Sequence, residues 1–246
     1  MKKIILSVVS ISILAMVLVG CGAKPASSND DIIIMGTNAE FAPFEYREGK
    51  EVVGFDVEIS KKIAEKLGKE LKIEDMKFEG LLAALEAGKV DFVIAGMTKD
   101  KEREKQVDFS DSYFLSSQLI TIKADDTSIN SGEDLKGKKI GVQLGTTGER
   151  EARDIEGAEV ISFDKGAMAL VDLANGKIDA VILDAEPTKN YTEGNDDLRV
   201  LDEQLTEEEY CIAVPKGNKE LLELINLTLK EIQESGEYEQ FINKYF

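Results

Sequence analysis

The residues best placed for ligand chemistry follow a short apolar run, Val90 to Ala95. A short run rich in β-branched residues is typical of a buried parallel strand, and ligands of α/β proteins bind just outside the carboxyl ends of such strands. Gly96, Thr98 and Arg103 follow that end. Glycine lets a ligand approach the backbone, threonine supplies a hydroxyl, and the planar guanidinium of arginine matches a carboxylate. The alternative for Arg103 is a solvated side chain within the charged run Lys99 to Lys105.

An internal repeat supplies a second candidate group. The sequence LEAGKVDFVIAG, from Leu85 to Gly96, recurs 88 positions later as LANGKIDAVILD, from Leu173 to Asp184. Two copies of a helix, glycine and strand unit predict two similar lobes. In register, Asp184 stands where the first copy has Gly96. If the strand ends face each other across a cleft, Arg103 and Asp184 form a clamp for a zwitterion.

Two further loops lie at predicted strand ends. The first carries Asn38, Glu40 and Phe41, and Pro43 ends regular structure there. The second carries three polar residues, Gln143, Thr146 and Thr147, and leads into a helix whose first N–H groups are available to an anion. The alternatives are that Phe41 is a core residue and that Glu40 is a solvated loop carboxylate.

Several catalytic and cofactor arrangements are absent from the sequence. The chain has no histidine, which excludes Ser-His-Asp, Cys-His and zinc–histidine sites. The run GEDLKGKK, from Gly132 to Lys139, lacks the final Ser or Thr of a phosphate loop, and no Gly-x-Gly-x-x-Gly fingerprint occurs. We therefore expect no catalytic residue, no metal and no cofactor.

The apolar pattern predicts the elements that hold these loops. Strands are expected over residues 32–35, 90–95, 116–122, 139–142 and 210–214, and helices around residues 55–67, 78–85, 167–174, 222–232 and 238–245. Gly68 and Gly88 end two of these helices, and Ser131 with Asp134 resembles a capping box. The helix around 78–85 and its strand predict a βαβ crossover. The predicted lobes are 31–115 with 211–246, and 116–210, joined by two crossings.

The N-terminus predicts export and anchoring. Lys2 and Lys3 precede an apolar segment, Ile4 to Val19, that is shorter than a membrane span. The following LVGC resembles a lipobox, which implies a lipoprotein signal peptide over 1–20, lipidation of Cys21 and a tether over 21–30. The alternative is a secretory signal with an incidental cysteine.

Composition narrows the partners. The formal net charge is −18, which disfavours nucleic acid, and 43% of the residues are hydrophobic, enough for a sizeable core. Once Cys21 is lipidated, Cys211 is the only other cysteine, and we expect it to be a small buried apolar residue.

Several motifs together carry a family resemblance. They are APFEY, VGFDVE, GLLAALEAGKVDFVIAGMT, ER followed by QVDFSDSYF, DLKGKKIGVQLGTTGE and YCIAVPKGN. Across Ile32 to Phe246 the chain resembles the polar amino-acid-binding proteins of ABC importers, family 3 of the bacterial extracellular solute-binding proteins, in lipoprotein form. The resemblance implies an α/β, two-lobed periplasmic-binding-protein fold of type II, each lobe a sheet flanked by helices, which closes on a free amino acid.

The same resemblance implies a role for each site residue. Arg103 and Thr98, with the Gly96 backbone and Thr147, hold the α-carboxylate, and Asp184 receives the α-ammonium. Phe41 and Phe55 flank the ligand side chain. Asn38, Glu40 and Gln143 fall where members of the family recognise its far end.

Arginine or lysine is the favoured ligand. A phenylalanine pair attracts a cation, and Glu40 offers a counter-charge. The alternative is glutamine or another neutral polar amino acid, since Asn38 and Gln143 both donate and accept. Two other classes stay open: a cyclohexadienyl dehydratase-like enzyme with Glu40 or Glu186 as general acid, and a sensor ectodomain. The expected partners are an ABC permease and an ATPase, and the chain is expected to be a non-enzymatic, extracytoplasmic monomer.

Overall fold

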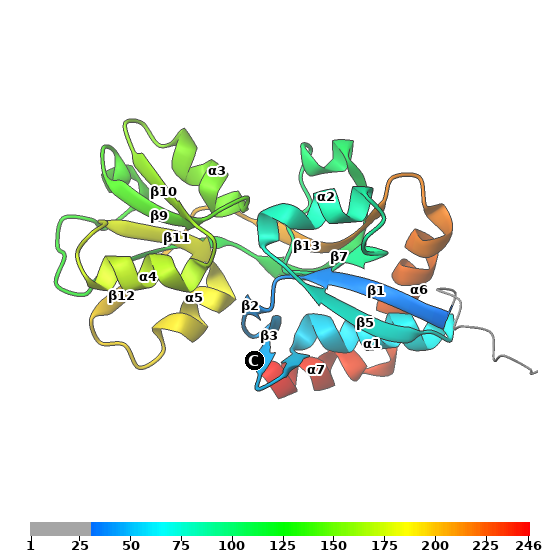
Figure 1. Cartoon of the computed structure of the whole chain (residues 1–246). Coiled ribbons are helices and arrows are strands. Elements are labelled where there is room, and N and C mark those ends of the chain that lie inside the picture. The colour runs from blue at the N-terminus through cyan, green and yellow to red at the C-terminus, as the bar shows by residue number, and fades with distance from the viewer. Residues whose placement is uncertain (1–30) are drawn as a thin grey trace, which may run out of the picture.

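The computed structural model describes residues 31–246, so the predicted signal peptide, Cys21 and the tether lie outside the described residues. The chain forms two lobes, each built on a five-stranded sheet (Figure 1). The lobe on the right of Figure 1, lobe 1, combines the first and last parts of the chain, and the lobe on the left, lobe 2, is its middle part.

Lobe 1 has a mixed sheet of order β5-β1-β6-β13-β7. The strands are β5 (Glu70–Asp75), β1 (Ile32–Thr37), β6 (Phe92–Val93), β13 (Glu208–Pro215) and β7 (Val107–Ser116). β1 is parallel to β5 and β6, whereas β13 is antiparallel to β6 and β7. A small separate sheet consists of β2 (Glu40–Phe41), β3 (Glu45–Glu48) and β4 (Glu51–Val53).

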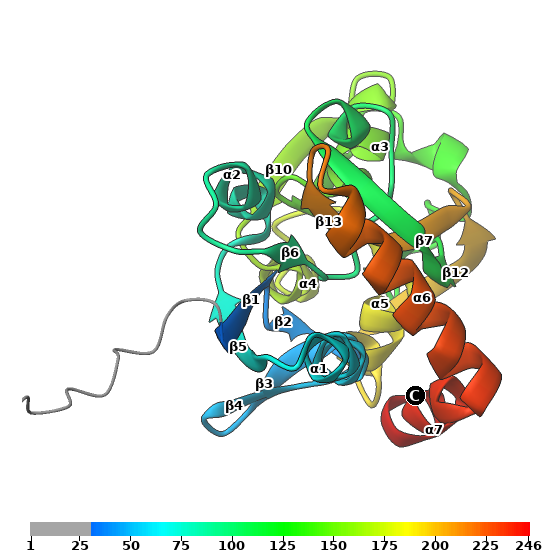
Figure 2. The ribbon, with the colours of Figure 1, turned by 90° about the vertical axis from the view of Figure 1, so that its right-hand side faces the viewer.

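Helices cover both faces of the lobe 1 sheet. One apolar cluster joins the sheet to α1 (Phe55–Leu67), α6 (Lys219–Ser235) and α7 (Glu237–Tyr245), and Figure 2 shows α6 lying along the sheet. A second cluster joins the opposite face to the short turn η2 (Phe78–Gly80) and α2 (Leu81–Glu86). Ile59 and Ile63 of α1 are fully buried, and Gly68 ends the helix at φ 66°, as the sequence predicts.

Lobe 2 repeats this plan with the order β10-β9-β11-β8-β12. The strands are β10 (Glu159–Phe163), β9 (Lys139–Gln143), β11 (Ala180–Asp184), β8 (Gln118–Lys123) and β12 (Leu198–Gln204). The helical elements of lobe 2 are η4 (Gly132–Leu135), α3 (Thr147–Asp154), α4 (Gly166–Ala174) and α5 (Ala185–Thr192). One further short turn, η3 (Arg103–Lys105), lies between β6 and β7 and belongs to lobe 1. The predicted capping box of Ser131 and Asp134 is present at η4.

The sequence repeat corresponds to one structural unit in each lobe. β6 and β11 are both the third strand of their sheets. The repeated aspartates make the same contact, since Asp91 accepts from Ile34 N at 2.7 Å and Asp179 accepts from Lys139 N at 2.8 Å. The prediction of two similar lobes is therefore confirmed.

Three expectations about elements need correction. Only Phe92–Val93 of the run 90–95 pairs as a strand, although most of the run is buried. The strand expected over 116–122 is two strands, because β7 pairs within lobe 1 and β8 pairs within lobe 2, with the break at Ser117. The apolar stripe that predicts the helix over 167–174, which is Ala167, Leu170, Val171 and Ala174, is not the buried face: Val171 is 51% exposed, and α4 buries Ala169, Leu170 and Leu173.

The chain passes between the sheets twice, between Ser116 and Gln118 and between Gln204 and Glu208. Strand pairing alone does not define the limits of the lobes, so the boundaries at 115/116 and 210/211 stay predictions. Over residues 31–246, no helix has both the length and the apolar character needed to cross a membrane. Cys211 is free and buried.

Candidate functional site

A small cavity lies where the strand ends of the two lobes meet. Its lining consists of Phe41, Phe78, Gly96, Thr98, Arg103, Gln143, Thr146, Thr147 and Asp184, of which all but Phe78 are predicted site residues. The space open to the centre of a water-sized sphere is only about 10 Å³, room for about one water molecule. A free amino acid therefore enters only if the two lobes move apart.

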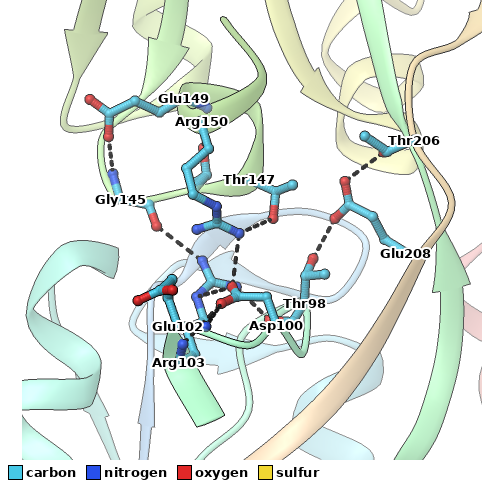
Figure 3. A network of polar contacts seen from close by, with 11 residues as sticks. Thr98, Asp100, Glu102, Arg103, Gly145, Thr147, Glu149, Arg150, Thr206 and Glu208 are labelled. Atoms are coloured by element: carbon cyan, nitrogen blue, oxygen red, sulfur yellow. Dashed lines mark hydrogen bonds and ion pairs between the residues drawn. The ribbon is translucent and has the colours of Figure 1, made fainter. Parts of the chain in front are cut away.

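Arg103 is held inside this cavity by both lobes (Figure 3). Its Nη1 donates to the Thr98 carbonyl at 2.6 Å, and its Nη2 donates across the cleft to the Gly145 carbonyl at 3.0 Å. Arg103 is only 6% exposed, so the alternative that it is a solvated side chain is wrong. Burial and the neighbouring Arg150 lower the pKa of Arg103 to about 10, so the guanidinium remains charged at neutral pH.

Gly96 has a conformation that a larger residue would not fit. Its φ is +51°, and a Cβ at this position would lie 2.5 Å from Cε1 of Phe41. Its N–H donates to Oδ2 of the buried Asp56 at 3.0 Å. The carbonyl of Gly96 is thus the backbone group that remains for a ligand.

Asp184 lies on the lobe 2 side, at the end of β11, and is 4% exposed. The Tyr210 hydroxyl donates to its Oδ1. Burial raises the pKa of Asp184 to about 7, and the nearby charge of Glu208 is the second cause. Arg103 and Asp184 therefore line one cavity from opposite lobes, the arrangement that the repeat predicts.

The start of α3 forms the third side of the cavity. Thr146 is the N-cap: its hydroxyl donates to the Gln143 carbonyl at 2.8 Å and accepts from Glu149 N. Thr147 accepts from Arg150 Nη2 at 3.1 Å. The first backbone N–H groups of a helix have no partner within it and carry partial positive charge, so this end favours a carboxylate.

The two amides at the predicted side-chain end bond to each other across the cleft. Gln143 Nε2 donates to Asn38 Oδ1 at 3.0 Å, and Asn38 Nδ2 donates to the Met76 carbonyl at 3.0 Å. Glu40 does not line the cavity. Its carboxylate pairs with Lys165 and its carbonyl accepts from the Tyr191 hydroxyl, so Glu40 lies at the junction of the lobes.

Phe55 is not at the cavity, which corrects its expected role. It is the first residue of α1, fully buried, with its ring centroid 5.4 Å from that of Tyr238 and 6.3 Å from that of Phe44. The second aromatic residue of the cavity is Phe78, whose ring centroid lies 5.4 Å from Cζ of Arg103. In the sequence, Phe78 has the spacing to Leu81, Leu82 and Leu85 that is typical of the buried face of a helix, so the pattern indicates a core residue.

Three buried acids lie behind the cavity lining and were also missed: Asp56 accepts from Gly96 N, Glu208 accepts from the Thr98 hydroxyl, and Glu45 neighbours Asp56. Glu45 and Asp56 are fully buried, and Glu208 is 5% exposed. Burial is the main cause that raises the pKa of Glu45 well above its ordinary value and that of Asp56 to about 6. Glu45 and Asp56 occur in the motifs APFEY and VGFDVE, which indicate the family but do not show what these two acids do.

Known proteins match this chain over almost its whole described length. The family model for bacterial extracellular solute-binding proteins, family 3, matches residues 33–246. The arginine-binding extracellular protein ArtP of Bacillus subtilis is 37% identical, over 100% of this chain and 98% of its own length. The holo ArgBP of T. maritima superposes with a TM-score of 0.80 at 42% identity, covering 83% of this chain and 92% of that one. An ancestral arginine-binding protein with bound glutamine gives a TM-score of 0.81 at 43% identity, covering 88% and 98%.

Proposed function

The chain belongs to family 3 of the bacterial extracellular solute-binding proteins, and on that premise we propose that it is the substrate-binding subunit of an ABC amino-acid importer and binds arginine. Arginine carries a carboxylate, an ammonium and a cationic side chain. The observation that carries the proposal is a cavity lined from opposite lobes by the buried guanidinium of Arg103 and the buried carboxyl group of Asp184, beside the rings of Phe41 and Phe78.

The α-carboxylate of the ligand would bind at Arg103 and the start of α3. Both carry positive charge or partial positive charge, and both lie at the cavity. The α-ammonium would bind Asp184 on the lobe 2 side. Because the two grips come from different lobes, the ligand favours the closed arrangement, in which both are made.

The cationic side chain would lie between Phe41 and Phe78. This aromatic pair takes the place of Phe41 and Phe55, the pair expected from the sequence. An aromatic face attracts a guanidinium by roughly 0.5–2 kcal/mol. Gln143, which lines the cavity and is bonded to Asn38, would accept a hydrogen bond from the guanidinium of the ligand. The names of ArtP and of the T. maritima protein support arginine.

Glutamine is the second candidate ligand. The cross-cleft amide pair of Asn38 and Gln143 suits a neutral side-chain amide, and the ancestral relative holds glutamine. Arginine is preferred over glutamine because a guanidinium gains a cation–π contact with the rings of Phe41 and Phe78, which a neutral amide lacks.

Calorimetric titration of the mature protein with arginine, lysine and glutamine tests the proposal. Arginine is expected to bind most tightly, and its affinity to fall with added salt more than that of glutamine, because salt screens the long-range attraction between a cationic ligand and a chain of net charge −18. Tighter binding of glutamine than of arginine would replace the proposed ligand. No binding by any of the twenty amino acids in a thermal-shift screen would reject amino-acid transport.

The chain is further proposed to act outside the cytoplasm as a monomer anchored by a diacylglyceryl group on Cys21, with a permease and an ATPase as partners. Membership of an extracellular family supports the location, and the LVGC motif supports the anchor. Mass spectrometry of the N-terminal peptide from native membranes tests the lipid. The relatives named above are binding proteins, which supports the absence of enzymatic activity, and incubation with prephenate tests the dehydratase alternative.

A further inference from the structure

A chain of hydrogen bonds runs from the cavity to both crossings between the lobes, and Figure 3 shows its part from Thr98 through Glu208 to Thr206. The Thr98 hydroxyl donates to Glu208 Oε2, and the Thr206 hydroxyl donates to Glu208 Oε1 at 2.7 Å. Thr206 Oγ1 in turn accepts from Gln118 N at 2.9 Å. Thr206 lies in the second crossing, and Gln118 is the first residue of β8, directly after the first crossing.

The directions of these bonds follow from the groups. A carboxylate only accepts, and a hydroxyl has a single hydrogen. With its hydrogen on Glu208, the Thr98 hydroxyl offers a ligand only lone pairs. It therefore accepts from a donor such as an ammonium and does not donate to a carboxylate, which differs from the role that the resemblance implies for Thr98.

Glu208 reaches Thr98 from outside the ligand cavity. Glu208 and Thr98 both line a second, larger cavity of about 750 Å³ beside the crossings, whereas only Thr98 also lines the ligand cavity. Glu208 is 5% exposed, so its two hydroxyl partners replace the water that a buried carboxylate loses. Glu208 thus acts on the site through Thr98.

We propose that Glu208 is a positioning residue of the binding site, which fixes the hydrogen of the Thr98 hydroxyl and ties Thr98 to both crossings. The proposal rests on the proposed amino-acid binding. In Glu208→Gln, one side-chain oxygen is replaced by an amide that donates, so one of the two hydroxyls loses its acceptor. Thr98 and Thr206 then share one acceptor oxygen, so the Thr98 hydroxyl is no longer held with its lone pairs toward the ligand.

A double-mutant cycle measures whether Glu208 acts through Thr98. Glu208→Gln, Thr98→Val and the double variant are titrated with L-arginine, after circular dichroism shows that each is folded. We expect Glu208→Gln to weaken binding by at least about fivefold in the wild-type background and by less than about twofold in the Thr98→Val background, because contacting residues are coupled. Glu209→Gln, the same charge change at the exposed neighbouring position, is the matched control and should leave the affinity within about twofold.

Two results would overturn the proposal: unchanged affinity in Glu208→Gln, or the same loss in both backgrounds. If Thr98→Val binds too weakly to titrate, Thr206→Val decides, because it removes a hydroxyl from Glu208 without altering the ligand cavity. The proposal is supported if Thr206→Val weakens arginine binding and Thr206→Ser, which keeps the hydroxyl, binds like the wild type. It is rejected if Thr206→Val leaves the affinity unchanged. Failure of the wild type to bind arginine is a failure of the proposed ligand only, and the cycle is then run with the amino acid that the thermal-shift screen identifies.

Discussion

Arg103 of lobe 1 donates from Nη2 to the carbonyl oxygen of Gly145 in lobe 2, at 3.0 Å. The guanidinium proposed to hold the ligand carboxylate is therefore also a bond between the lobes. Asp100 adds to this junction, because its Oδ2 lies 2.8 Å from Nη2 of Arg150 on α3 (Figure 3). The cavity and the closed arrangement thus depend on the same side chains.

Replacement of Arg103 by alanine is expected nearly to abolish arginine binding. Truncating one partner of a buried charge pair costs ~2–5 kcal/mol, roughly 30-fold to several thousand-fold in affinity. Calorimetry gives the affinity, and Lys105→Ala is the control. Lys105 belongs to the same charged run as Arg103, but its side chain is 66% exposed. Equal affinities of the two variants would show that Arg103 does not contact the ligand.

Because Phe78 lines the cavity and Phe55 does not, variants at these two positions should affect different quantities, ligand affinity at Phe78 and folding stability at Phe55. Phe78→Leu is expected to weaken arginine binding by roughly 0.5–2 kcal/mol, the value of a cation–π contact, with little change in unfolding free energy. Phe55→Leu is expected to lower the unfolding free energy by roughly 1–3 kcal/mol, because it disturbs a fully buried ring, and to leave the affinity unchanged. Urea unfolding and calorimetry on both variants check this, and the reverse pattern would restore Phe55 as the ligand contact.

Gly96 provides a test of the backbone at the site. Gly96→Ala places a Cβ 2.5 Å from the Phe41 ring at a positive φ, so both stability and arginine affinity should fall, the strain alone costing ~1–3 kcal/mol. Gly88 is the matched control, with φ +66° and no atom within 4 Å of an added Cβ. Gly88→Ala should lower only the urea midpoint. An affinity loss of equal size in both variants would show that it comes from general destabilisation.

The sequence allowed the lobes and most of the cavity to be predicted for a physical reason. The repeat ending at Gly96 and Asp184 marks two strand ends, and strand ends of α/β sheets face the ligand. The αL glycine Gly68 and the capping box at Ser131 also depend on local chemistry, which a sequence shows directly.

The missed residues depend on tertiary contacts. Phe78 has the spacing of a core helix, but its segment is a separate turn, η2, that precedes α2. Glu208 stands in an acidic run that looks solvated, yet it is buried like Tyr210 while Glu207 and Glu209 are exposed. That alternation along β13 is the signal that could have identified Glu208, because a strand buries every second residue.

Arginine affinity is expected to depend on pH through Asp184. The ammonium binds the ionised carboxylate, and the pKa of Asp184 in the free protein is raised to about 7. Above that pH the carboxylate is already ionised and affinity is constant. Below it, each binding event must expel a proton, so affinity falls by up to about tenfold per pH unit. Asp184→Asn should remove this pH dependence, which distinguishes Asp184 from Asp56, whose pKa burial also raises, to about 6.

The stability of the free protein should change with pH in the opposite direction. The pKa of Asp184 in the folded protein lies above that of an unfolded Asp, about 3.9, so its contribution to stability is present at low pH and is lost as the pH rises through about 7. Bound arginine reverses this by stabilising the ionised form. Calorimetry at pH 7 and below, in buffers of different ionisation enthalpy, should therefore show the release of protons on arginine binding. No proton release, together with constant affinity between about pH 5 and about pH 8, would place the ammonium away from Asp184.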